Sequence, residues 1–286
     1  MTTQARNMNR NRRIKETNVI SSEAINSEVG WKIGTWNVSG LAGKEDELMQ
    51  EFQRENLDIL GVTETKKKGR GEIEVPGGHL LIYSGVDINA RAKEGVGCII
   101  NGKHRQLVTK WDSITERILK IEMKLQMPTT LIVVYGPNED ERAANKDEFW
   151  EKMGEVVEDI KGRIIILGDM NGRVGRRDEE TGEVIGRHGE MPRNNNGVRL
   201  INFCILNDLI VTNTFFQHRE IHKYTREVKS RGEKSIIDYV LINRSNRKEV
   251  IDVRVRRGAE IYSDHYLLKA EIRMKVQEEK NKTQSD

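Results

Sequence analysis

Four polar side chains follow, or lie inside, the most hydrophobic stretches of this chain. They are Asn37 after residues 33–36, Glu64 after 60–63, Asp169 after 164–168 and Asp238 within 236–242. A carboxylate avoids a protein interior unless it is paired or binds a cation, because its desolvation is costly. Four such groups from four separate stretches therefore predict one polar cluster at the rim of a β-sheet.

The chemistry of this predicted cluster favours a hard metal ion. Carboxylate, amide and water oxygens are the ligands that Mg²⁺ prefers in proteins. We therefore expect a metal-dependent enzyme with Mg²⁺ as cofactor, for which Mn²⁺ can substitute.

The length of 286 residues suits one two-layered domain with tails. We expect a polar, basic, disordered tail at 1–29, a folded domain at 30–275 and a polar tail at 276–286. Residues 1–15 carry five basic residues and no acidic one. A solvated tail is favoured for them, and a transit peptide or a nuclear address stays open as the alternative.

The overall charge does not identify a partner. A formal net charge of +3 is weakly basic, and the distribution of charge matters more than its sum. Cys98 and Cys204 stand in apolar surroundings without metal-type spacing, which predicts reduced core thiols. No apolar stretch approaches the length of a membrane span, and no signal-peptide core is present. We expect a nuclear or cytoplasmic protein that is not secreted and has no membrane partner.

Apolar periodicity predicts many strands and few helices. The expected strands are 31–37, 57–63, 79–84, 95–101, 117–125, 130–135, 163–168, 209–213, 236–243, 250–255 and 267–275. The expected helices are 44–55, 139–160 with Asn138 as its N-cap, and 197–207. This mixed order, without strict alternation, predicts an α+β protein with two packed sheets flanked by helices.

Six short motifs contain the polar residues of the predicted cluster. In chain order they are Thr35-Trp36-Asn37-Val38, Thr63-Glu64-Thr65, Tyr135-Gly136-Pro137, Gly168-Asp169-Met170-Asn171, Ile237-Asp238-Tyr239 and Ser263-Asp264-His265. Several have an ordinary explanation when taken singly: Asn37 can cap a turn, and the motif at Tyr135 can be a simple strand exit. A carboxylate inside an apolar strand, as at Asp238, is the hardest to explain without a site.

In order and spacing these motifs resemble the endonuclease/exonuclease/phosphatase superfamily, which includes DNase-I-like nucleases and apurinic/apyrimidinic endonucleases. The resemblance covers about residues 31–274. It is closest to the endonuclease domains of RTE-like non-LTR retrotransposons and to craniofacial development protein 2-like proteins, through the stretches 168–175, 196–200 and 257–260. The resemblance implies a four-layered αββα sandwich with the site at one end of the two sheets.

The resemblance also implies a metal-binding set and a catalytic set. Glu64 is the expected principal Mg²⁺ ligand, with Asn37 and Asp264 nearby or bridging through water. The expected catalytic residues are Asp169 to deprotonate the attacking water, Asn171 and Tyr135 as phosphate hydrogen-bond donors, and His265, held by Asp238, at the scissile phosphate. Phosphodiester hydrolysis independently needs such groups, because a nucleophile must be generated and negative charge stabilised.

The expected function is Mg²⁺-dependent nicking of duplex DNA, leaving 3′-hydroxyl and 5′-phosphate ends, by a monomer of retrotransposon origin. Basic residues near the site are candidates for contact with the DNA backbone. They are Lys66, Lys67, Lys68, Arg70, Arg173 and Arg226. The alternatives are an abasic-site repair endonuclease, a phosphatase acting on phospholipids or inositol phosphates, and a domesticated chromatin- or protein-binding module of the same fold.

One position departs from the family pattern. The family commonly carries Thr-Trp before the Ile-Asp-Tyr strand, whereas this chain has Tyr224-Thr225-Arg226. The missing aromatic weakens the expectation of contacts to a base or to an abasic sugar, but not that of metal chemistry, and favours intact duplex DNA as the substrate.

Overall fold

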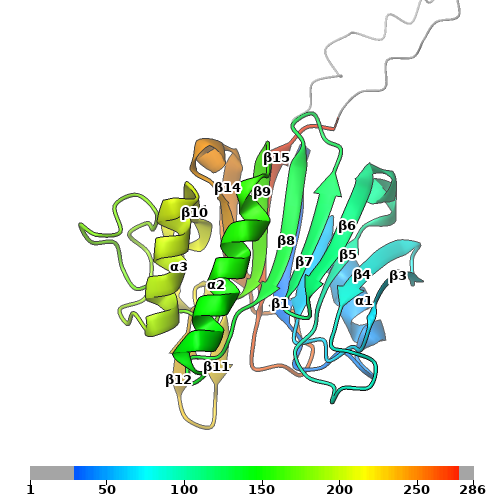
Figure 1. Ribbon diagram of the computed structural model, residues 1–286, viewed down its shortest axis with the longest axis horizontal. Helices are drawn as coiled ribbons and strands as arrows, with labels where there is room; N and C mark the ends of the chain where they lie inside the picture. Colours follow the sequence, from blue (N-terminus) through cyan, green and yellow to red (C-terminus); the bar gives the residue numbers. More distant parts are fainter. Residues whose placement is uncertain (1–28, 277–286) are drawn as a thin grey trace, which may run out of the picture.

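The computed structural model describes residues 29–276. Apart from Val29 and Val276, the two predicted tails lie outside the described residues. The described part of the chain forms two large mixed β-sheets with helices on their outer faces (Figure 1). This arrangement confirms the predicted α+β sandwich.

The first sheet has seven strands in the order β14-β15-β1-β2-β5-β4-β3. Their bounds are β1 Val29–Asn37, β2 Ile59–Thr63, β3 Arg70–Val75, β4 His79–Ser84, β5 Val96–Ile100, β14 Val250–Arg256 and β15 Leu267–Met274. At its centre β1 and β2 run parallel, and the neighbouring pairs are antiparallel.

The second sheet has six strands in the order β10-β13-β9-β8-β7-β6. Their bounds are β6 Val108–Thr115, β7 Ile118–Met123, β8 Thr129–Tyr135, β9 Arg163–Asp169, β10 Leu209–Val211 and β13 Asp238–Asn243. Here β8 and β9 form the parallel central pair. A separate two-stranded ribbon joins β11 Arg226–Val228 to β12 Glu233–Ser235.

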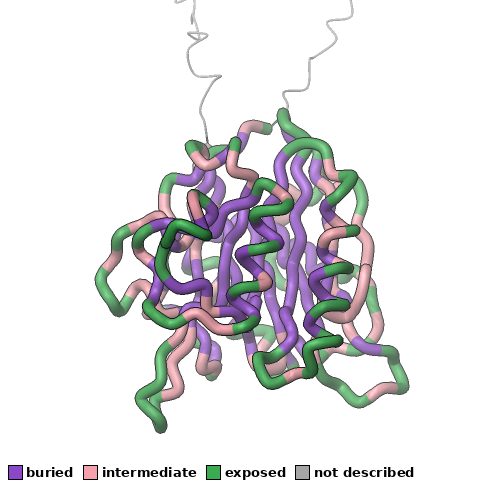
Figure 2. The backbone as a smooth tube through the Cα atoms, turned by 60° about the vertical axis from the view of Figure 1, so that its left-hand side comes forward, coloured by how far each residue is buried: buried purple, intermediate pink, exposed green. Residues whose placement is uncertain are grey.

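Three α-helices complete the layers, and each buries one apolar face. Helices α2 (Ala143–Glu158) and α3 (Asn195–Leu206) pack on the second sheet, and α1 (Glu45–Arg54) packs on the first. A third and larger apolar cluster fills the space between the sheets. The buried strands of Figure 2 therefore lie at the centre of a four-layered molecule whose exposed residues are mostly on its loops and outer helix faces.

All eleven predicted strands and all three predicted helices are present, with shifted ends. The prediction that Asn138 caps the second helix is wrong: α2 begins four residues later than expected, with Arg142 at the capping position. Asn138 instead donates its backbone N–H to the Glu141 carboxylate, in the turn that precedes the helix. The third helix begins two residues earlier than expected, because the Asn194 side chain accepts the N–H of Gly197 and caps it.

Both cysteines are buried and unpaired, as expected for core thiols. Among residues 29–276, no helix is long and apolar enough to cross a membrane.

Candidate active site

The central strands of both sheets end at the same rim of the sandwich. In the first sheet, parallel pairing sets Asn37 beside Thr63, so Glu64 follows at the same level. In the second sheet, parallel pairing sets Tyr135 beside Asp169. Four predicted positions therefore lie at the same rim: Asn37, Glu64, Tyr135 and Asp169. Each is at the carboxyl end of a parallel strand or directly follows it.

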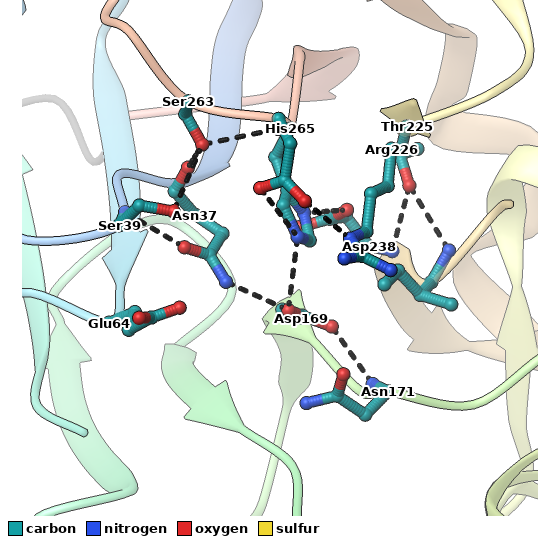
Figure 3. A network of polar contacts seen from close by, with 12 residues as sticks. Asn37, Ser39, Glu64, Asp169, Asn171, Thr225, Arg226, Asp238, Ser263 and His265 are labelled. Carbon is teal, nitrogen blue, oxygen red and sulfur yellow. Dashed lines mark hydrogen bonds and ion pairs between the residues drawn. The ribbon is translucent and has the colours of Figure 1, made fainter. Parts of the chain in front are cut away.

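Two antiparallel strands bring the remaining positions to this rim from the opposite direction. Asp238 opens β13 and lies directly across from Asp169 in the register of the sheet. His265 comes two residues before β15, which runs antiparallel to β1. The polar network in Figure 3 therefore contains side chains from both sheets, as the sequence predicts.

His265 and Asp238 form a buried ion pair. The imidazole Nδ1 is 2.8 Å from Asp238 Oδ2, and both side chains are at most 5% exposed. Burial alone would lower the pKa of His265, but the charges of Asp238 and Asp169 outweigh burial and raise it to about 9. The ring is therefore an imidazolium at neutral pH.

Thr225 holds the backbone at the start of β13, where Asp238 lies. Its buried hydroxyl oxygen accepts the N–H groups of both Ile237 and Asp238, each at 3.1 Å. The other carboxylate oxygen of Asp238, Oδ1, is buried without a hydrogen-bond partner among the described residues. Thr225 was not among the predicted site residues, although it occupies the threonine position of the family's Thr-Trp pair, because its contact with the start of β13 crosses the rim.

Asp169 lies beside this ion pair, with His265 Nε2 3.8 Å from its Oδ2. It accepts the Asn37 side-chain amide at Oδ2 and the Asn171 backbone N–H at Oδ1, both at 2.9 Å. Burial and the neighbouring charge of Asp238 raise the pKa of Asp169 to about 7, although His265 opposes the shift. A carboxylate with this pKa is suited to accept a proton near neutral pH.

Glu64 faces a cleft of about 680 Å³ on the other side of Asn37 from Arg226 (Figure 3). Its backbone has a positive φ of 54°, an uncommon conformation for a residue other than glycine that costs energy and is often found at functional sites. The one ion-pair partner of its carboxylate among the described residues is the flexible Lys66, at 3.1 Å.

The donor atoms at Glu64 fit a hard cation. Glu64 offers a carboxylate that is 24% exposed, and the adjacent Asn37 Oδ1 accepts a single backbone N–H, from Ser39 at 3.0 Å. A carbonyl oxygen has two lone pairs, so Asn37 keeps one for a further contact. Oxygen donors of this kind suit Mg²⁺.

Tyr135 lines the same cleft. Burial and the charges of Glu64 and Asp169 raise the pKa of its hydroxyl well above the usual range, so the group stays a hydrogen-bond donor. Arg117, which the sequence did not reveal, lies 5.2 Å from the ring centroid and donates to the carbonyls of Tyr135 and Gly136. Its guanidinium also binds Glu94 and Glu141, tying three loops around the tyrosine.

Asn171 and Asp264 reach the rim but make different contacts from those expected. The Asn171 side-chain amide donates to the Gly136 carbonyl at 3.0 Å. The Asp264 carboxylate, expected near the metal, accepts Arg226 Nε at 2.7 Å, while its other oxygen lies 4.0 Å from His265 Nε2. Arg226, which was expected to contact DNA, therefore pairs with Asp264 and neutralises its charge.

The other predicted DNA contacts are dispersed. Lys66 binds Glu64, Lys67 lies over the Tyr83 ring, and Lys68 donates to the Ile88 carbonyl. Arg70 opens the edge strand β3. Arg173 pairs with the buried Glu190, so part of its charge is used inside the fold.

Asp169, Asp238 and His265 bring ligand-type atoms within 4.8 Å of one another, a spacing that could hold a metal ion. Two features argue against Mg²⁺ at that point. The imidazolium already compensates the two carboxylates, and Mg²⁺ prefers oxygen ligands to imidazole. The chemistry of this trio therefore suits proton transfer better than binding of Mg²⁺.

A protein-family model and several known proteins match most of this chain. The model of the endonuclease/exonuclease/phosphatase family matches residues 34–265. Craniofacial development protein 2 from Bos taurus is 33% identical over 249 residues, which cover 85% of this chain and 41% of the relative. The chain thus spans about two fifths of the length of the curated relatives it matches.

Solved structures share the fold at low sequence identity. The Xenopus laevis APE2 catalytic domain has a TM-score of 0.67 at 19% identity, covering 87% of this chain and 94% of that one. The 3′ phosphatase NExo from Neisseria, bound to a product DNA hairpin, has a TM-score of 0.64 at 20% identity, covering 85% and 99%. The endonuclease domain of TRAS1, a telomere-specific non-LTR retrotransposon, has a TM-score of 0.60 at 15% identity, covering 86% and 99%.

Proposed function

The chain belongs to the endonuclease/exonuclease/phosphatase family, and from that premise we propose that it is a Mg²⁺-dependent endonuclease that nicks duplex DNA. The products would be 3′-hydroxyl and 5′-phosphate ends. The observation that carries the proposal is the buried His265 imidazolium held by Asp238 next to Asp169. A positive donor and a nearby base are the two groups that hydrolysis of a phosphodiester requires.

Each residue of the rim has a chemical task in this proposal. Asp169 takes the proton of the attacking water, because its raised pKa matches neutral pH and its carboxylate has lone pairs beyond those used by Asn37 and Asn171. His265 donates to the scissile phosphate, and Asp238 keeps the ring charged and oriented. Tyr135 and Asn171 donate to phosphate oxygens, Asn171 through the amide hydrogen that the Gly136 carbonyl does not accept.

Glu64 would hold the metal ion, with the Asn37 amide oxygen next to it and Asp264 reached through water. When bound, Mg²⁺ supplies positive charge that stabilises the phosphate in the transition state. Lys66 would have to leave Glu64, which frees its ammonium for the DNA backbone.

Duplex DNA is the proposed substrate, and a retrotransposon the proposed origin. Arg91 and Lys93 line the Glu64 cleft, and Arg226 and Lys234 line a second cleft beside Asn171. Basic residues on both sides of the rim suit a phosphate backbone that passes across it. The likeness to the endonuclease domain of TRAS1, a non-LTR retrotransposon, supports the origin.

Cleavage of matched oligonucleotide duplexes tests the proposal. One duplex is intact and the other carries a single abasic analogue, and each is incubated with Mg²⁺ or with EDTA. We expect Mg²⁺-dependent nicking of both duplexes at comparable rates, with ends that a ligase can rejoin. Cleavage confined to the abasic duplex would identify a repair enzyme instead, and DNA binding without cleavage of either duplex would favour a binding module.

A further inference from the structure

An aromatic side chain projects into solvent immediately before the Ser263-Asp264-His265 motif. Tyr262 is 81% exposed, whereas its preceding neighbour Ile261 is fully buried and His265 is 5% exposed. Its side chain makes no hydrogen bond or ring contact within residues 29–276. Tyr262 therefore does not contribute the buried apolar area by which aromatic rings usually stabilise a fold.

The backbone of Tyr262 is strained. Its φ of 52° is in the left-handed region, which a bulky side chain rarely adopts. Glycine or asparagine would occupy this turn with less strain. Neither the backbone conformation nor burial therefore favours a tyrosine at position 262.

Specific hydrogen bonds hold this conformation in place. The Glu260 carboxylate accepts the N–H groups of Ile261 and Tyr262, at 3.1 and 2.8 Å. Lys44 Nζ donates to the carbonyl of Tyr262 at 3.2 Å and to that of Val38 at 2.8 Å. The turn is thus fastened to the loop that follows Asn37, so the backbone that carries the ring is held next to the rim.

Further contacts link this turn to the catalytic groups. Ser263 Oγ donates to the Asn37 carbonyl at 2.8 Å and accepts the His265 N–H at 3.1 Å. The Trp36 indole donates to the His265 carbonyl at 3.0 Å. The tyrosine is therefore attached directly to the segment that positions the imidazolium.

We propose that Tyr262 stacks on an unpaired nucleobase of the DNA strand that is cut, next to the scissile phosphate. This inference rests on the proposed function. A phenol carries no charge for phosphate, but every base has a face on which an aromatic ring can stack. A protruding ring can also hold a base that has left its helical stack. Sites with an unpaired base at the cleavage step should therefore be preferred over fully paired ones.

The test compares Tyr262→Asn and Tyr262→Phe with the parent. Loss of a base–aromatic stack should weaken binding of a duplex with one unpaired 2-aminopurine at the cleavage step by about 5- to 100-fold. Tyr262→Phe should keep the affinity and the quenching of 2-aminopurine fluorescence. Because asparagine tolerates the left-handed turn, Tyr262→Asn should melt at or above the parent temperature, which separates stacking from a structural role.

Leu206→Ala provides the matched control. Leu206 is 83% exposed at the end of α3, next to β10, whose register with β13 sets it at the opposite end of the sandwich from Asp238. The control should bind the 2-aminopurine duplex as the parent does. Equal affinity and quenching for Tyr262→Asn and the parent would overturn the inference while leaving the proposed nicking intact. Tyr262-dependent binding by a parent that cleaves no DNA would keep the stacking contact but reject the nuclease proposal.

Discussion

At the scale of single residues, the site depends on where charge is buried. Asp169 and Asp238 lie opposite each other in register, and two buried carboxylates in contact repel each other unless a cation compensates them. His265 is that cation. Removing one member of this trio should therefore change the behaviour of the other two.

A double-mutant cycle tests whether His265 and Asp238 act as a unit. Asp238→Asn removes the charge that holds the ring as an imidazolium, so adding His265→Ala should cost little more. We expect each single change to slow nicking by about 10²- to 10⁴-fold and the double change to be clearly less than additive. The ion pair of His218 and Asp252, also at 2.8 Å, serves as a control whose disruption should leave nicking unchanged. Fully additive losses in the His265 cycle would show that the two residues work independently.

Stability of the metal-free protein should fall as pH rises from about 6.5 to 9. The raised pKa of His265 means that its ion pair stabilises the fold fully below the ordinary value of 6.5 and is lost as pH passes about 9. Asp169 acts in the same direction. Its pKa is raised to about 7, so the stability that its protonated form contributes is lost as pH rises from its ordinary value of 3.8 through about 7. Urea unfolding in EDTA at several pH values should show this slope, and His265→Gln should flatten its part above pH 7. A parent whose stability rises over this interval would contradict the assignment of charge.

Glu64→Gln should weaken Mg²⁺ binding more than DNA binding, because the charge removed faces the cation site. The Mg²⁺ concentration for half-maximal nicking should rise by about tenfold or more, as loss of a charged ligand costs on the order of 1.4 kcal/mol or more. Calorimetric Mg²⁺ titration gives a second readout that does not depend on turnover. Glu74→Gln, in an exposed pair with Arg105, is the control. Unchanged Mg²⁺ affinity would remove Glu64 from the ligand set.

At the scale of secondary-structure elements, the rim depends on how closely the central strands approach. Gly168 directly precedes Asp169, and a Cβ atom at this position would lie 1.8 Å from the Val134 carbonyl oxygen of β8. Backbone atoms of a buried central strand cannot move aside cheaply. Any side chain at this position would push β9 away from β8 and displace Asp169 from Tyr135.

Gly168→Ala should therefore lower the free energy of unfolding by more than about 2 kcal/mol and reduce nicking in the fraction that folds. Gly154→Ala in α2 is a matched control, because a Cβ there would meet nothing within 4 Å. That control should be neutral or stabilising by about 0.5–1 kcal/mol, as expected for alanine in a helix. Equal stability of the two variants in urea would show that β8 and β9 leave room for a Cβ atom at position 168.

The elements also show which parts of a fold a sequence pattern reveals. Buried strands such as β8 and β9 were predictable because their apolar runs are long and continuous. The strands β3 and β6 were missed because each lies at a sheet edge and has few buried side chains. An edge strand in which no side chain is fully buried leaves no clear hydrophobic period in the sequence.

At the scale of the whole molecule, the topology explains both the success and the limits of sequence reasoning about the site. Polar residues at strand ends could be predicted to gather, because parallel and antiparallel neighbours share one rim. Arg117 and Thr225 could not be predicted, since their partners come from other strands and loops. The pairing of Arg226 with Asp264 was missed for the same reason.

DNA hydrolysis at this rim should depend on Asp169 as the base. Nicking of supercoiled plasmid by the parent and by Asp169→Asn, each with Mg²⁺ or EDTA, is the decisive measurement. We predict relaxed circles only for the parent with Mg²⁺, and a loss of about 10²- to 10⁴-fold for the variant. The variant should also be at least as heat-stable as the parent, because it removes a charge that burial and Asp238 disfavour. Nicking by Asp169→Asn at the parent rate, or by the parent in EDTA, would contradict the account.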